Sequence, residues 1–225
     1  MFDVLVVGGG ISGLSTALAL RATFGESLRL GVIDPVFGAR IPNVRASALA
    51  AGSVNLLEAI GVWPDVADRA GPMHRLKITD SRRNDSVRPL YLQFDEPLET
   101  GAPFSFMVRN GDVIAALEAK IRIQNCEILN SALVRLMPAS RNIEIRLADG
   151  RHVKTRLLIG ADGVNSQVRR SAGIEIVTHD YKRSAIVATL AHEEEHDGEA
   201  VQHFLPPGPF AMLPLAGRRS SIVWT

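Results

Sequence analysis

This 225-residue chain has one cysteine, few aromatic residues and almost no net charge, and the cysteine count and the charge balance each exclude a class of protein. Cys126 has no second cysteine to pair with, so a disulfide-built secreted domain is excluded; a small buried hydrophobe in a reducing compartment is indicated. Lys and Arg number 25 against 24 Asp and Glu, a balance that gives no electrostatic case for nucleic acid or for a strongly anionic membrane. With 46% hydrophobic, 22% charged and 5% aromatic residues, the composition is that of a globular protein.

Long hydrophobic runs are also missing. The longest uncharged stretch, 4–20, has 17 residues and is interrupted by glycines, which places it at the lower edge of what spans a bilayer. Asp3 precedes it, where a secretory signal would carry positive charge. We therefore expect a cytoplasmic protein without a signal or a membrane anchor.

Apolar periodicity predicts an α/β fold that opens with a βαβ unit. The β-branched run 3–7 predicts a buried strand, the spacing of apolar residues over 12–25 predicts a helix, and 28–33 predicts a second strand that ends at Asp34. Further along, the patterns predict helices at 46–60 and 112–123, strands at 76–78, 90–94, 185–190 and 210–224, and a hairpin of 143–147 with 152–159.

A glycine-rich loop between the first strand and the first helix satisfies G-x-G-x-x-G with Gly8, Gly10 and Gly13. The first glycine permits a tight turn, the second lets the backbone approach a pyrophosphate, and the third allows close packing of helix and strand. Asp34 follows Gly13 by 21 residues, where a carboxylate can accept hydrogen bonds from ribose hydroxyls. The pattern predicts dinucleotide binding; the alternative is a glycine-rich turn of another α/β protein with an incidental aspartate.

A second informative loop lies at 157–169. Three apolar residues lead into Gly160-Ala161-Asp162-Gly163, and a helix is predicted to start at Ser166. This order indicates a second strand-loop-helix approach to the same dinucleotide. The alternative is a hairpin strand followed by a turn, with Asp162 as an ordinary turn aspartate.

Several segments together resemble the class A flavoprotein aromatic hydroxylases, the p-hydroxybenzoate hydroxylase-like family. The shared features are the G-x-G-x-x-G start, an Arg followed by Ala-Leu within 45–49, and the G-A-D-G-x-x-S-x-V-R segment of 160–169. Stretches 43–52, 57–63 and 204–215 are similar to the ubiquinone-biosynthesis branch, the 2-octaprenyl-6-methoxyphenol hydroxylases. The resemblance covers nearly the whole chain.

The resemblance implies a Rossmann-like FAD-binding domain with an inserted, β-rich substrate domain. It divides the chain into an FAD-binding part, 1–72 and 104–175, and a substrate-side part, 73–103 and 176–225. Seven cofactor-binding residues are implied: Gly8, Gly10 and Gly13 at the pyrophosphate, Asp34 at the ribose, Arg45 reaching a phosphate from the start of its helix, Arg109 (or its neighbour Asn110), and Asp162 beside the FAD. No catalytic side chain is identified, and no metal ligand is expected.

The implied reaction is hydroxylation of a prenylated phenol in ubiquinone biosynthesis, with FAD as cofactor and NAD(P)H and O₂ as co-substrates. Such a substrate partitions into membranes, which implies peripheral contact with the inner membrane and a complex with other enzymes of the pathway. No nucleic-acid partner is expected.

Two departures from the family pattern stand out. Asn43 occupies a position where members often have aspartate, two residues before Arg45. A third flavin motif, a Gly-Asp-Ala-His type of segment followed by Pro and a Gly-Gln-Gly run, is absent. We therefore expect a truncated chain, and a non-catalytic FAD- or ADP-binding fragment is the alternative function.

One rival motif is His192-Glu193-Glu194-Glu195-His196, which fits the H-E-x-x-H pattern of zinc hydrolases. On a helix the two histidines would share a face and bind Zn²⁺, with Glu193 as general base. The β-branched run before it and Asp197-Gly198 after it favour a solvated loop between strands instead.

Overall fold

The computed structural model describes residues 1–39, 44–82, 85, 87–95 and 102–225. The chain divides into two units, each with its own sheet and core. Their bounds are 1–41, 56–62 and 114–178 for the first unit, and 42–55, 63–113 and 179–225 for the second.

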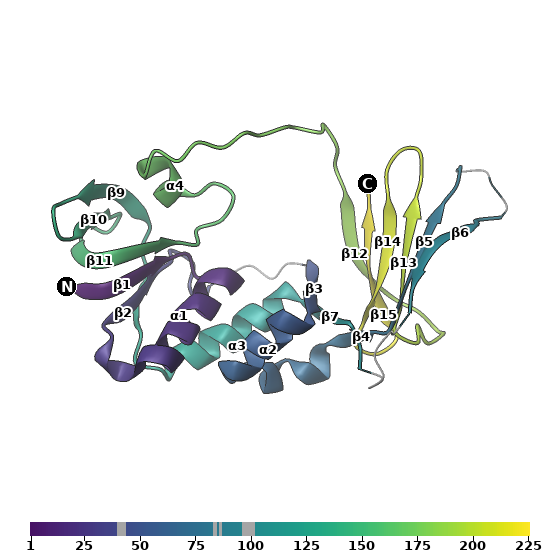
Figure 1. Cartoon of the computed structure of the whole chain (residues 1–225), viewed down its shortest axis with the longest axis horizontal. Coiled ribbons are helices and arrows are strands. Elements are labelled where there is room, and N and C mark those ends of the chain that lie inside the picture. The colour runs from purple at the N-terminus through teal and green to yellow at the C-terminus, as the bar shows by residue number, and fades with distance from the viewer. Residues whose placement is uncertain (40–43, 83–84, 86, 96–101) are drawn as a thin grey trace. The chain divides into compact units, whose positions relative to one another are not determined.

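The first unit is built on a six-stranded sheet in the order β8-β2-β1-β11-β10-β9 (Figure 1). The strands are β1 (Phe2–Val7), β2 (Leu30–Ile33), β8 (Glu127–Leu129), β9 (Leu133–Pro138), β10 (Ile143–Leu147) and β11 (His152–Gly160). Because β1 is parallel to both of its neighbours, β2 and β11, the carboxyl ends of these three strands meet at one edge.

The predicted βαβ unit is confirmed: β1, helix α1 (Ile11–Phe24) and β2 follow one another, and α1 lies against β1 and β2. Leu14, Ala17 and Leu18 form the buried side of the helix. Every residue of β2 is buried, as expected for an interior parallel strand.

The antiparallel part of this sheet consists of β9, β10 and the first half of β11. The predicted hairpin of β10 and β11 is confirmed, whereas β8 and β9 were not expected from the sequence. One face of these strands joins the parallel strands in a common core of Leu5, Val7, Ile33, Leu129, Ile145 and Leu147. The opposite face, with Arg146 of β10, is exposed.

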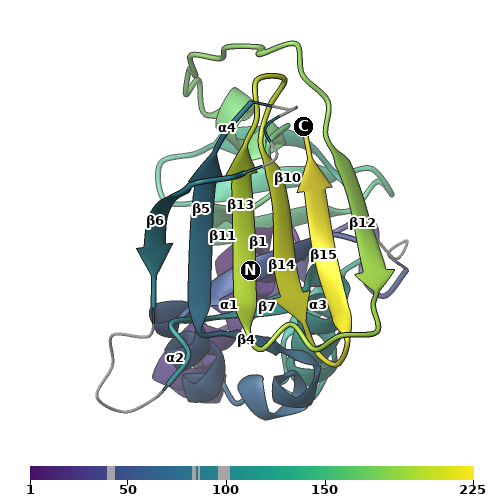
Figure 2. The ribbon, with the colours of Figure 1, turned by 90° about the vertical axis from the view of Figure 1, so that its right-hand side faces the viewer.

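The second unit contains a six-stranded sheet in the order β12-β15-β14-β13-β5-β6, seen face-on in Figure 2, and a three-stranded sheet, β3-β7-β4. The larger sheet is made of β5 (Arg75–Asp80), β6 (Leu90–Phe94), β12 (Ile186–Ala191), β13 (Glu199–Phe204), β14 (Phe210–Leu215) and β15 (Arg219–Trp224). The smaller sheet is made of β3 (Ala46–Ala50), β4 (Gly71–Met73) and β7 (Ser105–Arg109).

The two sheets of this unit share a core of Met73, Met107, Ala200 and Leu215. A Cβ atom at Gly71 would lie 2.4 Å from the carbonyl oxygen of Pro214, so a glycine is needed where the sheets meet. The strands predicted at 76–78, 90–94, 185–190 and within 210–224 lie in the larger sheet.

The prediction of one helix over 46–60 is wrong at its start. Residues 46–50 form strand β3, which pairs with β7, and helix α2 covers only Ala51–Ala59. The alanine-rich sequence has helical propensity, but hydrogen bonding to a strand about sixty residues away overrides it. Arg45 therefore precedes a strand and not a helix.

Two further helices complete the fold, α3 (Asn110–Arg122), which confirms the predicted helix at 112–123, and the short α4 (Gln167–Ser171). Single 3₁₀ turns lie at Gly25–Ser27, Trp63–Asp65 and Ala67–Arg69. Within the described residues, no helix combines the length and the apolar character that crossing a bilayer requires.

The second unit takes in residues that the sequence analysis assigned to the FAD-binding part, namely 42–55, 63–72 and 104–113. These residues carry β3, β4 and β7, whose small sheet packs on the larger one through Met73 and Met107. Such packing joins segments far apart in the chain, so composition does not reveal it.

Candidate functional site

A cavity of about 400 Å³ lies in the first unit at the carboxyl ends of β1, β2 and β11. This is the edge at which open α/β sheets bind ligands. The cavity is lined by Val7, Gly8, Gly10, Ile33, Asp34, Pro35, Val36, Ala132, Leu133, Ala161, Asp162 and Gly163. The glycine loop, the acid after the second strand and the second loop are thus brought together.

Gly8 forms the turn that follows the carboxyl end of β1. Its φ of +108° is a conformation that side chains rarely adopt, and its N–H donates to the carbonyl of Ile33 at 2.8 Å. A Cβ atom at Gly8 would lie 2.2 Å from the carbonyl oxygen of Ala161, and one at Gly13 would lie 1.8 Å from that of Gly8. Both glycines are therefore required for the loop, the helix and the second loop to pack.

Gly10 serves a different purpose. It is the residue before the first turn of α1, and no described atom lies within 4 Å of a Cβ built on it. The first turn of α1 carries no acidic side chain and has no side-chain cap, so the N–H groups and the positive end of the helix dipole beside Gly10 are not neutralised by the helix itself. An anion such as a phosphate finds both room and hydrogen-bond donors here.

Asp34 follows the carboxyl end of β2, is 5% exposed, and is one of the residues that line the cavity. One oxygen accepts a hydrogen bond from the N–H of Gly9 at 2.6 Å, and the other accepts from Val36 at 2.9 Å. A carboxylate at the end of the second strand is the group that accepts hydrogen bonds from ribose hydroxyls in dinucleotide-binding folds. Asp34 thus shapes the glycine loop as well as facing the cavity.

The second loop approaches the first directly, since the N–H of Ala161 donates to the carbonyl of Val7 at 2.7 Å. The carboxylate of Asp162 accepts hydrogen bonds from the Ser166 hydroxyl at 2.5 Å, from Gln167 N–H at 2.6 Å and from Val168 N–H at 3.1 Å. Asp162 therefore holds the start of α4 through its side chain and borders the cavity.

These bonds give Asp162 a pH-dependent part in stability. Burial raises the pKa of its carboxyl, but the hydrogen bonds from Ser166, Val168 and Gln167 outweigh burial and leave the pKa below its ordinary value of 3.8. The resulting stabilisation is complete above the ordinary pKa and is lost as the pH falls through the lowered one. We expect Asp162→Asn to lower Tm at pH 7 by about 2–4 °C, the effect of losing about 1 kcal/mol.

Thermal unfolding followed between neutral and acid pH tests this prediction. The difference in Tm between the two proteins should shrink toward zero as the pH falls below 3.8, the ordinary carboxyl value. Glu175→Gln, at an exposed position of the same unit, is the control. A Tm difference that stays constant with pH would contradict the assignment.

The remaining predicted residues lie in the second unit. A hollow of about 370 Å³ there is lined by Arg45, Ala46, Ser47, Asn110, Val187, Ser221 and Val223. Asn110 accepts a hydrogen bond from Ser47 at 2.7 Å, whereas Arg109 is ion-paired with Asp112 at 2.8 Å. Of the two alternatives named from the sequence, Asn110 lines the hollow with Arg45 and Arg109 does not. Asn43 lies outside the described residues.

The rival H-E-x-x-H motif does not lie on a helix. His192 and His196 belong to the connection between β12 and β13, as the flanking residues indicated. His196 Nε2 bonds to the carbonyl of Leu215 at 2.7 Å, and its Nδ1 accepts from Gly198 N–H at 3.1 Å. Within the described ranges, no group of three His, Cys, Asp or Glu side chains is arranged to hold a metal ion.

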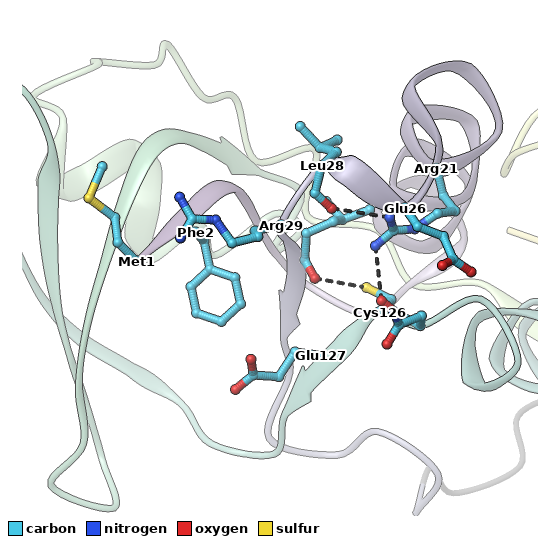
Figure 3. Close-up of a pocket in the computed structure, with 10 residues that line it drawn as sticks. Met1, Phe2, Arg21, Glu26, Leu28, Arg29, Cys126 and Glu127 are labelled. Carbon is cyan, nitrogen blue, oxygen red and sulfur yellow. Dashed lines mark hydrogen bonds between the residues drawn. The ribbon is translucent and has the colours of Figure 1, made fainter.

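A larger hollow, about 670 Å³, lies at the opposite, amino ends of β1, β2 and β8 (Figure 3). Its most buried charged side chain is Arg21, at 5% exposed. Arg21 donates to the carbonyls of Gly25 at 2.6 Å, Asn125 at 2.9 Å and Leu28 at 3.1 Å. These bonds join the end of α1 to two chain connections, so the charge serves the fold.

Cys126 borders this second hollow, and its thiol lies 3.6 Å from the carbonyl of Leu30. Burial raises the pKa of the thiol to about 11. We therefore expect alkylation at pH 8 to be about 100-fold slower than for a free cysteine, because the thiolate is the reacting form. Mass spectrometry after iodoacetamide treatment measures the rate, with the urea-unfolded chain as the control. Equal rates in the two states would contradict burial of the thiol.

Some residues around the cavity were missed from the sequence. The loop after Asp34 is held by α3, since the guanidinium of Arg122 lies 4.7 Å from the ring centre of Phe37, and Gly38 N–H donates to Glu118 at 3.2 Å. No sequence signal marks these contacts across some eighty residues. Ser166, by contrast, was predicted from the sequence as the start of a helix, and its Oγ caps α4 by accepting from Arg169 N–H at 2.9 Å.

Comparison with known proteins agrees with this geometry. A family model described as FAD binding domain matches residues 1–225. The chain is 39% identical over 226 residues to the ubiquinone hydroxylase UbiL of Rhodospirillum rubrum, covering 99% of this chain and 51% of that protein. It is 34% identical over 246 residues to the mitochondrial ubiquinone biosynthesis monooxygenase COQ6 of Xenopus tropicalis, covering 100% of this chain and 51% of that protein.

Among solved structures, a variant of PqsL from P. aeruginosa matches with a TM-score of 0.83 and 24% identity, covering 99% of this chain and 60% of that one. This likeness concerns the fold. The chain spans about half the length of the two relatives above.

Proposed function

Since this chain belongs to the FAD-binding domain family, we propose that it is part of an FAD-dependent monooxygenase that hydroxylates a prenylated phenol in ubiquinone biosynthesis. NAD(P)H and O₂ are the co-substrates in this proposal. Its support is the similarity to UbiL and COQ6, whose names state a ubiquinone hydroxylase and a ubiquinone biosynthesis monooxygenase.

The observation that carries the proposal is the convergence of the glycine loop, Asp34 and the second loop on one cavity. FAD fits this set of residues. Gly10 leaves open space beside the start of α1, where N–H groups can bind a pyrophosphate, and Asp34 offers a carboxylate to a ribose. A cavity of about 400 Å³ is within the usual range for small-ligand sites.

In this proposal the chain's own residues bind and orient, while bound FAD supplies the redox chemistry that inserts one oxygen atom into an aromatic ring. Gly8 and Gly13 keep the loop tight, and Gly10 lets the diphosphate approach the helix. Asp34 accepts from the ribose. Asp162 acts by positioning the second loop through its bonds to the start of α4.

Residues 73–103 and 176–225 are the proposed substrate side. Arg45, together with Arg109 or Asn110, belongs to the proposed cofactor-binding set; Arg45 and Asn110 line one hollow of the second unit, and Arg109 is paired with Asp112. A charge-assisted bond from Arg45 to a phosphate is the contact that this residue type favours. The substrate is an electron-rich phenol with a polyprenyl tail. Peripheral contact with the inner membrane and association with other enzymes of the pathway belong to the same proposal.

Two measurements test the function. First, the purified chain mixed with FAD and desalted should retain visible flavin absorbance, and unlabelled ADP should compete for the site. Second, the full-length gene product should oxidise NAD(P)H faster when a prenylated phenol is added, and one atom of isotopically labelled O₂ should appear in the ring.

Each alternative function predicts a different outcome of these measurements. Flavin retention without substrate-dependent turnover by the full-length product would leave only a nucleotide-binding protein. Activity that follows stoichiometric zinc and disappears with a chelator would favour the hydrolase alternative at His192 and His196. Absence of FAD and ADP binding by both proteins would overturn the proposal.

A further inference from the structure

The near-zero net charge of the chain conceals a local excess of basic residues in the first unit. Residues 130–173 contain eight Lys and Arg against three Asp and Glu, whereas the rest of the chain contains 17 against 21. This segment includes β9, β10 and β11, whose exposed face lies opposite the core of the unit. The sequence balance gave no case for an anionic surface partner, but the distribution of charge does.

Two of these eight cations, Arg135 and Arg146, lie with a histidine in one row across the three strands. In the register of the sheet, Arg146 of β10 stands directly opposite Arg135 of β9 and directly opposite His152 of β11. Directly opposed residues of antiparallel strands point to the same face, and all three side chains are exposed. We name Arg135, Arg146 and His152 the basic row. Arg141, in the turn between β9 and β10, adds a further exposed cation.

Charged side chains next to the basic row are paired with opposite charges, whereas the two arginines of the row have no such pair in the part of the chain that the structure describes. One step along the strands, Glu144 pairs with Lys154 at 2.5 Å, and in the following turn Arg151 pairs with Asp149 at 2.7 Å. Among the described residues, no carboxylate pairs with Arg135 or Arg146. Like charges placed directly opposite one another destabilise a sheet, so such a row indicates a function in binding.

We propose that the basic row docks the protein on an anionic phospholipid surface. The proposal rests on the proposed function, because a prenylated phenol is held in a bilayer and its hydroxylase must work there. Guanidinium groups on an open strand face suit phosphate headgroups, which can move laterally to meet them. Val134, exposed beside Arg135, offers an apolar contact next to the charges.

The expected loss of vesicle binding follows from the number of charges that a substitution changes. A basic residue near an anionic bilayer strengthens binding by about fivefold, and the attraction weakens as salt is added. The substitution Arg146→Glu removes one cation from the row and places a carboxylate opposite Arg135. It should therefore weaken binding at least 25-fold while the new cross-strand pair keeps or raises Tm.

Vesicle co-sedimentation of the FAD-loaded chain tests the proposal. Vesicles of phosphatidylcholine with phosphatidylglycerol are compared with phosphatidylcholine alone, at low and at high salt. Lys182→Glu is the matched control: it changes the net charge equally at an exposed lysine of the second unit that is paired with Asp180. We expect binding to the anionic vesicles only, loss of binding in Arg146→Glu, and binding within twofold of the original chain in Lys182→Glu.

Three results would overturn the proposal: equal binding by Arg146→Glu, equal binding to neutral vesicles, or no vesicle binding at low salt. The last would leave an acidic protein as the partner of the basic row. Because FAD retention is measured on the same samples and turnover is not a readout, failure here is distinct from failure of the proposed hydroxylase.

Discussion

Gly13→Ala is expected to abolish FAD binding and to destabilise the chain by about 3 kcal/mol, because a buried clash forces backbone to move. The Cβ atom would lie 1.8 Å from the carbonyl oxygen of Gly8, which is backbone and cannot rotate away. Moving α1 outward would take its first N–H groups away from the cavity. Urea unfolding measures the stability, and flavin fluorescence titration measures the affinity.

Gly10→Ala is the matched variant that separates binding from folding. Its Cβ atom would meet nothing within 4 Å among the described residues, and its φ of −74° suits any residue. We expect a stability loss of no more than about 1 kcal/mol, because alanine is a poorer helix N-cap residue than glycine, but FAD affinity at least tenfold weaker, since the methyl group fills the approach to the diphosphate. Unchanged FAD affinity in Gly10→Ala would show that the ligand does not approach the loop there.

Asp34→Ala is expected to weaken FAD binding by about 100-fold, the equivalent of about 2.7 kcal/mol. Two losses combine: the ribose loses its acceptor, and the Gly9 N–H, which now donates at 2.6 Å, loses its partner in a buried place. The loop that should bind the diphosphate is therefore no longer held in position. Isothermal titration with FAD and with ADP measures the effect, and both ligands should be affected alike.

Asp3→Ala is the control for this substitution. Asp3 also accepts a backbone N–H, that of Arg29 at 3.1 Å, but at the amino end of the same sheet. Removing it should leave the affinity for FAD within twofold. If Asp3→Ala weakened binding as much as Asp34→Ala, the effect would be a general loss of fold and not the loss of a ribose contact.

The difference between Gly10 and its two partners was not visible in the sequence, although all three belong to one motif. Gly8 and Gly13 are constrained by contacts with backbone, of Ala161 and of Gly8 respectively, while Gly10 faces open space. The motif therefore contains two kinds of glycine. Gly8 and Gly13 are needed for the loop to pack, and Gly10 is needed for the proposed binding of the diphosphate.

The role of the Asp162 side chain was also not determined by the sequence. The sequence allowed either a residue beside FAD or an ordinary turn aspartate, and the structure shows that the carboxylate is bonded to the start of α4 while the residue lines the cavity. Its proposed role is therefore to position the loop. Arg109 is a similar case, because its pairing with Asp112, three residues on, depends on the helix that begins between them.

The βαβ opening, the glycine loop and the acid at the end of the second strand were determined by the sequence itself, because periodicity and spacing are properties of neighbouring residues and need no distant partner. The tertiary structure alone decided that 46–50 is a strand, that Asn110 lines the hollow with Arg45, and that three basic residues form one row. Each of these depends on the pairing of segments far apart in the chain. Such pairing is selected by the packing of whole sheets, and no local pattern records it.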